Sequence, residues 1–164
     1  MDYQQKKSIV SIVESVAVVA VYCIYVLGKL RQGAVSMEDT RFFAVTMLTF
    51  IGIGIAFTIA IQVVFHVLLS VSIAVREREK ESKEIEHAIN AAMVEDERDK
   101  IIDLKSTRIP YMAAMLGFVA GLVMLALQYP VAVMLNILFI ASGLGAVGEG
   151  VAKLLYYKAG VRNG

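Results

Sequence analysis

Residues 111–157 read YMAAMLGFVAGLVMLALQYPVAVMLNILFIASGLGAVGEGVAKLLYY, and this apolar stretch decides the fold. A single helix of that length would extend about 70 Å, whereas the hydrocarbon core of a bilayer is about 30 Å thick. Proline suits the first turn of a new helix, and the residue before a proline resists the α conformation. Because Pro130 follows Tyr129 near the middle of the stretch, the sequence predicts two spanning helices joined by a tight turn at 128–130.

Two earlier apolar zones, residues 8–30 and 42–75, also exceed the roughly 18 residues that mark a spanning helix. The second would extend about 51 Å as a helix, so we expect its end to project from the membrane. The predicted fold is therefore an all-α polytopic membrane protein with four transmembrane helices and a cytosolic helical hairpin between helices 2 and 3. Residues 1–75 would hold helices 1 and 2, residues 76–108 the hairpin, and residues 109–164 helices 3 and 4.

The composition agrees with a bilayer as the solvent. Of the 164 residues, 58% are apolar, and the mean hydropathy is +0.68. These values lie well above those of a typical soluble domain. The net charge of +1 argues against a nucleic-acid partner, which would need a large excess of basic residues on one face. The stretch after Lys6 and Lys7 is too long for a signal peptide and lacks a cleavage site, so we interpret it as the first span.

The distribution of basic residues predicts the orientation of the chain. In a four-span arrangement, one side of the membrane carries thirteen of the 16 lysines and arginines, and the other side carries only Lys29, Arg31 and Arg41. Because cytosolic loops are enriched in these residues, we expect both termini to be cytosolic. The expected location is the plasma (inner) membrane.

The predicted hairpin carries an apolar stripe. Five residues recur at the spacing of one helix face: Ile85, Ala88, Ile89, Ala92 and Met93. A second cytosolic helix is expected to follow, with Asp96 as its cap, and to lead into span three at Pro110. Glu97 and Asp99 would then complement the dipole of its first turn. This acidic motif, Asp96-Glu97-Arg98-Asp99, is explained in that way without any ligand.

The acidic motif and the residues after it resemble part of a known group of proteins. Asp96-Glu97-Arg98, followed by an isoleucine at 101 or 102, a polar turn and two apolar spans, resembles a motif of small uncharacterised bacterial and archaeal membrane proteins. The likeness covers roughly residues 94–128. It implies a membrane protein and no particular activity.

Three ionisable residues lie inside the predicted spans, all toward the cytosolic side: Glu14, His66 and Glu149. A charge at the centre of a span costs roughly 2.5–3.5 kcal/mol on insertion scales, so these residues are candidates for a proton or cation pathway. The structural alternatives are an ion pair of Glu149 with Arg98, Arg108 or Lys153, headgroup water around Glu14, and a hydrogen-bonded His66. The glycines in 143–150 fit either a bent helix that presents Glu149 or close helix packing.

Small residues recur at four-residue spacing in every predicted span. Such residues let helices approach closely in lipid. The pairs and triplets are Ser11 and Ser15, Gly52 and Ala56, Gly117, Ala120 and Gly121, Ala141 and Gly145, and Ala146 and Gly150. The contacts belong either to one four-helix bundle or, in part, to an interface between copies of the chain.

Catalytic and metal-binding motifs are sparse. Glu84 and His87 have the Glu-x-x-His spacing of di-iron bundles, but such bundles need two of these motifs. Two histidines and Cys23, which we interpret as a buried apolar residue, do not make a typical zinc site. No phosphate-binding loop or nucleophile elbow occurs in the sequence. We therefore expect neither an enzyme nor a cofactor.

Two functions fit these observations. The first is a non-enzymatic membrane protein, surrounded by membrane lipid, that forms homo-oligomers or binds a protein partner through the apolar stripe of the cytosolic hairpin. The second is a small oligomeric transporter or channel subunit for protons or small cations, with Glu149, His66 and Glu14 along the pathway.

Overall fold

A computed structural model describes residues 3–76 and 97–159. These residues form helices joined by turns, and four helical stretches are long and apolar enough to cross a membrane. The helices are α1 (Tyr3–Arg31), α2 (Thr40–Arg76), α4 (Glu97–Ser106), α5 (Arg108–Ala126) and α6 (Val131–Ala159). The all-helical fold and the number of candidate spans agree with the sequence prediction.

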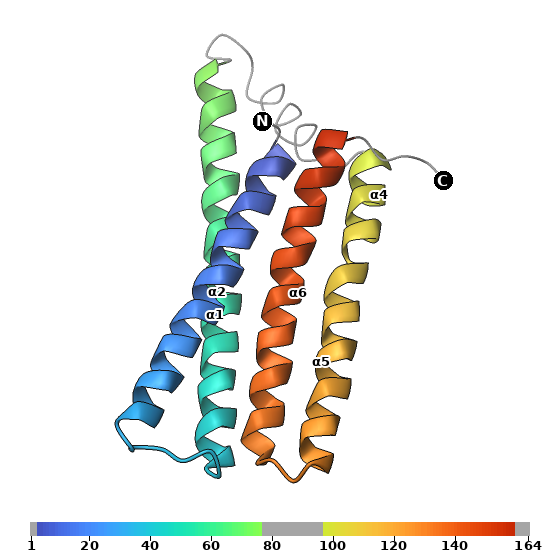
Figure 1. The fold of residues 1–164 in the computed structure, drawn as a ribbon. Helices are drawn as coiled ribbons and strands as arrows, with labels where there is room; N and C mark the ends of the chain where they lie inside the picture. The colour runs from blue at the N-terminus through green and yellow to red at the C-terminus, as the bar shows by residue number, and fades with distance from the viewer. Residues whose placement is uncertain (1–2, 77–96, 160–164) are drawn as a thin grey trace.

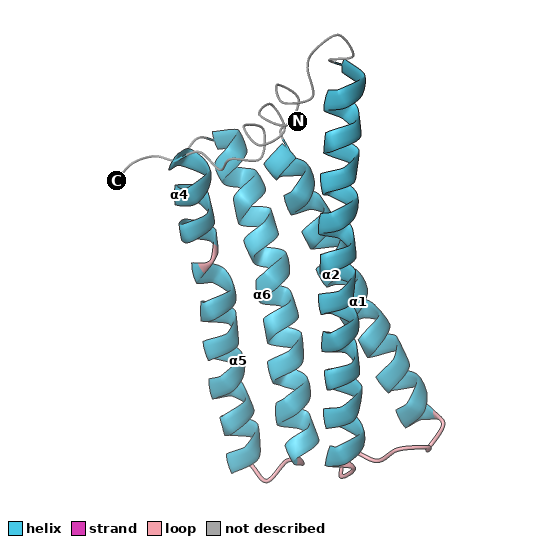
Figure 2. Ribbon diagram, turned by 180° about the vertical axis from the view of Figure 1, so that it is seen from behind, coloured by secondary structure: helices cyan, strands magenta, loops and turns pink. Residues whose placement is uncertain are grey.

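Helix α6 is the centre of the arrangement. It packs against α5 on one side and against α1 on the other, and these are the two largest helix contacts in the described structure (Figure 1). Helices α1 and α2 cross each other, so that α1 lies near α6 at the end with the chain termini, whereas α2 lies near α6 at the opposite end (Figures 1 and 2). The four long helices therefore form an open layer.

The glycine-rich stretch of α6 explains how one helix packs closely against two neighbours. A Cβ atom on Gly145 would lie 2.8 Å from Pro110 Cα and 2.9 Å from Ala113 Cβ, both on α5. A Cβ atom on Gly150 would instead collide with Ile12 on α1. Close backbone approach of this kind is how helices associate in lipid. The glycines of α6 therefore serve helix packing in two directions, and α6 runs through them as an unbroken helix.

An aromatic cluster joins α1, α2 and α6 in the half of the structure away from the termini. Tyr22 and Phe43 are 1% and 0% exposed, and they pack with Val26, Met47 and Ala132. The Tyr22 hydroxyl group donates a hydrogen bond of 2.7 Å to Asn136 Oδ1, which satisfies a polar group in an apolar setting. This cluster fixes the position of α2 at this end.

The two prolines lie where helices are interrupted. Helix α5 ends at Ala126, Gln128 adopts a positive φ of 64°, and α6 begins directly after Pro130, so the predicted turn at 128–130 is confirmed. At the other end of α5, Pro110 has no N–H group to donate to the carbonyl group of Ser106. The helix is interrupted there at Thr107, between α4 and α5.

Beyond the aromatic cluster, α2 diverges from α6 (Figure 1). It has 37 residues against 29 in α6, and it extends past the other helices at the end with the termini (Figure 1). Gly52 and Ala56 are exposed, and a Cβ atom on Gly52 would meet nothing within 4 Å. This pair of small residues thus has no helix against it among the described residues. The predicted apolar stripe at 85–93 and the predicted cap Asp96 lie outside the described residues.

Candidate functional site

The polar side chains gather at the end of the layer where both termini lie, in two neighbouring cavities. The smaller cavity, about 140 Å³, lies between α1, α4 and α6. The larger, about 660 Å³, lies between α1, α2 and α6. Lys7 and Ser11 of α1 line both cavities, so α1 forms a wall between them.

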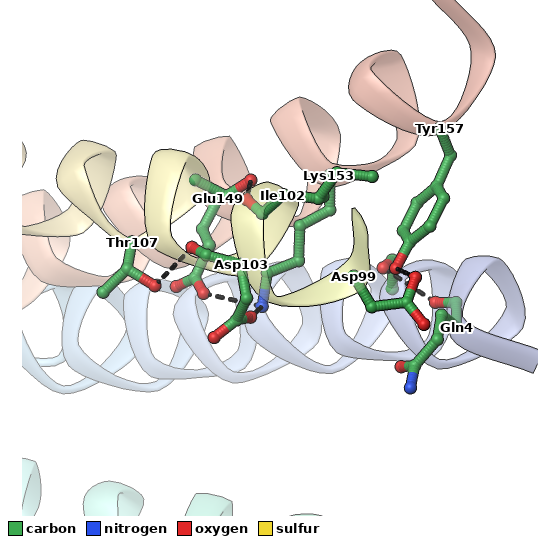
Figure 3. Close-up of polar contacts among 10 residues, drawn as sticks. Gln4, Asp99, Ile102, Asp103, Thr107, Glu149, Lys153 and Tyr157 are labelled. Carbon is green, nitrogen blue, oxygen red and sulfur yellow. Dashed lines mark hydrogen bonds and ion pairs between the residues drawn. The ribbon is translucent and has the colours of Figure 1, made fainter. Parts of the chain in front are cut away.

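Lys153 is the centre of the smaller cavity. Its amino group lies 2.6 Å from Asp103 Oδ1 on α4 and 2.8 Å from Glu149 Oε1, one turn earlier on α6 (Figure 3). The side chains of Lys153 and Glu149 are about one quarter exposed, whereas that of Asp103 is 57% exposed. One ammonium group thus links two carboxylates from two helices, in a setting that is only partly screened by water.

A second set of contacts lies one turn closer to the end with the chain termini, before Asp103 on α4 and after Lys153 on α6. The Tyr157 hydroxyl group donates a 2.7 Å hydrogen bond to Asp99 Oδ1 (Figure 3). The guanidinium group of Arg98 donates to the backbone carbonyl oxygen of Tyr157 over 3.2 Å. We refer to Arg98, Asp99, Asp103, Glu149, Lys153 and Tyr157 together as the α4–α6 cluster.

The inner face of α4 is apolar and closely packed. Ile102 is 1% exposed, and Ser106 is fully buried with its hydroxyl group donating to the carbonyl oxygen of Ile102 over 2.7 Å. A ten-residue helix is marginal in water by itself, so packing against α6 supplies the stability of α4. This apolar packing and the α4–α6 cluster together hold a polar helix against the end of α6, a candidate span.

The larger cavity is a groove with mainly apolar walls and one partly exposed acidic group, Glu14. The Thr58 hydroxyl group of α2 donates a 2.6 Å hydrogen bond to Glu14 Oε1 of α1, and it also lies 3.0 Å from the carbonyl oxygen of Gly54. Phe50 and Phe139 line the groove nearer the aromatic cluster. Lys7 lies at its other end, two helical turns or about 10 Å from Glu14 along α1.

The structure separates the predicted pathway residues. Glu14 and Glu149 lie at the same end of the layer but in different cavities, on opposite sides of α1. Glu149 is paired with Lys153, one of its three expected partners. The side chain of His66 lies outside the described part of α2, whose backbone is helical there. Of the acidic motif, Glu97 is exposed, and Arg98 and Asp99 contact Tyr157.

Sequence reasoning did not identify Asp103, Tyr157 or Thr58 as members of these sites. A usable signal exists for the first two. Asp99 and Asp103 are four residues apart, and Glu149, Lys153 and Tyr157 repeat the same spacing, so two complementary polar helix faces are visible in the sequence. Thr58 has no such signal, because it is 44 residues from Glu14.

Metal binding has no support from these residues. Within residues 3–76 and 97–159, no three histidine, cysteine, aspartate or glutamate side chains are grouped so that they could hold a metal ion.

Comparisons of the chain with protein-family models, with curated proteins and with solved structures give no match.

Proposed function

We propose that the protein is a non-enzymatic, multi-pass protein of the plasma (inner) membrane that acts by assembly, with copies of itself or with a protein partner, at its cytosolic face. The N- and C-termini would lie on that face. The observation that carries the proposal is the attachment of α4 to α6 through the α4–α6 cluster.

That attachment gives the cytosolic face a rigid element. Helix α4 is too polar to lie in the hydrocarbon core, yet Ile102 and Ser106 are buried against the neighbouring helices. Hydrogen bonds and ion pairs at two successive turns hold it in one orientation. The predicted apolar stripe at 85–93 precedes α4 in the sequence and lies outside the described residues.

The outer face of α4 supports the proposal further. Ile101 and Leu104, three residues apart on one face, are 39% and 72% exposed. Leu104 precedes the apolar part of α5 by about one turn, so it lies where headgroups or another protein would meet the helix. Together they form a small apolar surface on an otherwise polar helix, next to the predicted contact segment.

The matched pair Leu104 and Leu116 allows a direct test. The two leucines are similarly exposed, at 72% and 69%, but they lie about 18 Å apart along the helix. A photo-crosslinking amino acid is placed at either position in cells, and the masses of the products are measured. We expect a discrete protein adduct from position 104 and only lipid adducts from position 116. Equal protein adducts from both positions, or none from either, would contradict assembly at the cytosolic face.

A second candidate function is a small oligomeric subunit that carries protons or small cations. It is favoured by the Glu14–Thr58 hydrogen bond in a groove between spanning helices, because an ionisable group inside a membrane is expensive to keep. Proton flux into proteoliposomes tests it. We expect loss of flux in Glu14→Gln and little change in Glu149→Gln, whose carboxylate already has Lys153 as its partner.

A further inference from the structure

The groove between α1, α2 and α6 has the size and chemistry of a ligand site. Its volume of about 660 Å³ lies within the range of pockets that hold drug-sized molecules. Most of its lining is apolar, with Val18, Ile51, Ile55 and Leu138 among the wall residues. A few polar groups, including Glu14, Thr58 and Gln62, lie toward the end with the termini. Mostly apolar walls with a few placed polar groups are typical of small-molecule sites.

The carboxylate of Glu14 favours a positively charged molecule in the groove. Within the described residues, Glu14 has the Thr58 hydroxyl group as its hydrogen-bond partner and takes part in no ion pair. The positive charge of Lys153 lies across α1, in the other cavity. Lys7 lies about 10 Å away along the helix axis. A carboxylate in apolar surroundings favours a cation beside it, whereas an anion there would be repelled.

The rest of the groove sets the size and polarity of that cation. Calcium is held by six to eight oxygen ligands, and one carboxylate with a few hydroxyl groups supplies few of them. Phe50 lies eight residues, or about 12 Å, before Thr58 on α2, so an extended apolar body could reach from Glu14 toward the aromatic rings.

We propose that this groove binds a hydrophobic organic monocation, with its positive charge beside Glu14 and its apolar body between α1, α2 and α6 toward Phe50 and Phe139. The ligand class is a quaternary ammonium, a phosphonium or a protonated amine on an apolar or aromatic scaffold. The proposal concerns binding alone, and it holds whether or not the protein assembles or carries ions.

Tetraphenylphosphonium and tetraphenylborate provide a matched pair of probes, since they have nearly the same shape and opposite charge. Binding of tritiated tetraphenylphosphonium to the purified full-length protein in lipid nanodiscs is measured with either compound as the unlabelled competitor. We expect saturable binding that unlabelled tetraphenylphosphonium displaces and tetraphenylborate does not. Equal displacement by both compounds, or no saturable binding, would overturn the proposal without requiring any variant.

Two isosteric substitutions then locate the charge. Glu14→Gln should weaken binding at least tenfold, which corresponds to about 1.4 kcal/mol. Glu149→Gln is the control, because its carboxylate lies in the smaller cavity, and it should bind like the unmodified protein. Glu14→Asp keeps the charge and should retain more affinity than Glu14→Gln. Equal affinities in Glu14→Gln and the unmodified protein would place the ligand elsewhere.

The absence of tryptophan from the chain allows the groove to be observed directly. Phe50→Trp places one fluorophore in the groove, and Phe118→Trp places one on α5, where residue 118 is 44% exposed and outside the groove. We expect tetraphenylphosphonium to change the emission of the first variant in a saturable manner and that of the second only linearly. Quenching of the first variant by brominated lipid that tetraphenylphosphonium does not relieve would show a lipid chain in the groove instead.

Discussion

Lys153 on α6 and Asp103 on α4 are joined by an ion pair of 2.6 Å, although they lie 50 positions apart in the chain. The same ammonium group forms an ion pair with Glu149, so the residue that attaches α4 also neutralises a carboxylate on the candidate span α6. This arrangement leaves Glu14 as the acidic group in the larger cavity. The two cavities thus differ in electrostatic character.

Lys153→Met should loosen α4. Both carboxylates would lose their partner, but Asp103 is more than half exposed, so we expect a cost of about 1 kcal/mol. That cost corresponds to roughly fivefold faster amide hydrogen exchange in residues 97–106, with α5 unchanged. Lys158→Met, at an exposed position on the same helix, is the control. Unchanged exchange in α4 would show that apolar packing alone holds the helix.

Gly145→Ala should destabilise the protein, because the new methyl group would lie 2.8 Å from Pro110 Cα, and backbone yields little. Overpacking of this kind costs about 1–3 kcal/mol. Gly52→Ala adds the same methyl group where nothing lies within 4 Å, so it should leave stability unchanged or raise it by up to about 1 kcal/mol. Thermal unfolding in detergent compares the two variants. The same loss of stability in both would argue against close packing between α5 and α6.

Tyr22→Phe removes the hydrogen bond to Asn136 and keeps the ring. Hydrogen bonds between membrane helices contribute about 0.6 kcal/mol on average and up to about 1.7 kcal/mol, so we expect a loss in this range. Tyr25→Phe is the control, since this ring is 43% exposed and its hydroxyl group forms no hydrogen bond among the described residues. Reversible unfolding under steric trapping measures both. A larger loss in the Tyr25 variant would contradict the assignment.

Single cysteines should report the orientation of the chain. In a Cys23→Ser background, Met37→Cys lies in the turn between α1 and α2, and Lys100→Cys lies on α4; both positions are exposed. We expect a membrane-impermeant maleimide to label position 37 in intact cells and position 100 only after the membrane is opened. The reverse pattern would place the termini outside the cytosol, against the bias in basic residues.

The sequence was sufficient to predict the four candidate spans and the turn between α5 and α6. These features depend on local quantities: the length of an apolar run and the position of Pro130. A helix after the acidic motif was also predictable, because Glu97 and Asp99 suit a first turn, and residues 97–106 form α4.

Relations between helices were less accessible from the sequence. Four-residue spacing suggested packing for Gly52 and for Gly145 alike, but only Gly145 faces a neighbouring helix among the described residues. Likewise, depth along a span placed Glu14 and Glu149 at one level, whereas the wall formed by α1 puts them in separate cavities. Spacing shows which residues share a helix face, but the neighbour of that face depends on the whole fold.

The central position of α6 has a consequence for biogenesis. Helices α1 and α2 leave the ribosome well before α6, yet the largest interface of α1 in the described structure is with α6. If the candidate spans are inserted in chain order, α1 and α2 would have only their own crossing contact and lipid or an insertion factor to rely on until α6 follows. The order of synthesis therefore differs from the order of packing, and the N-terminal half of the chain should remain loosely associated until the last helix has been inserted.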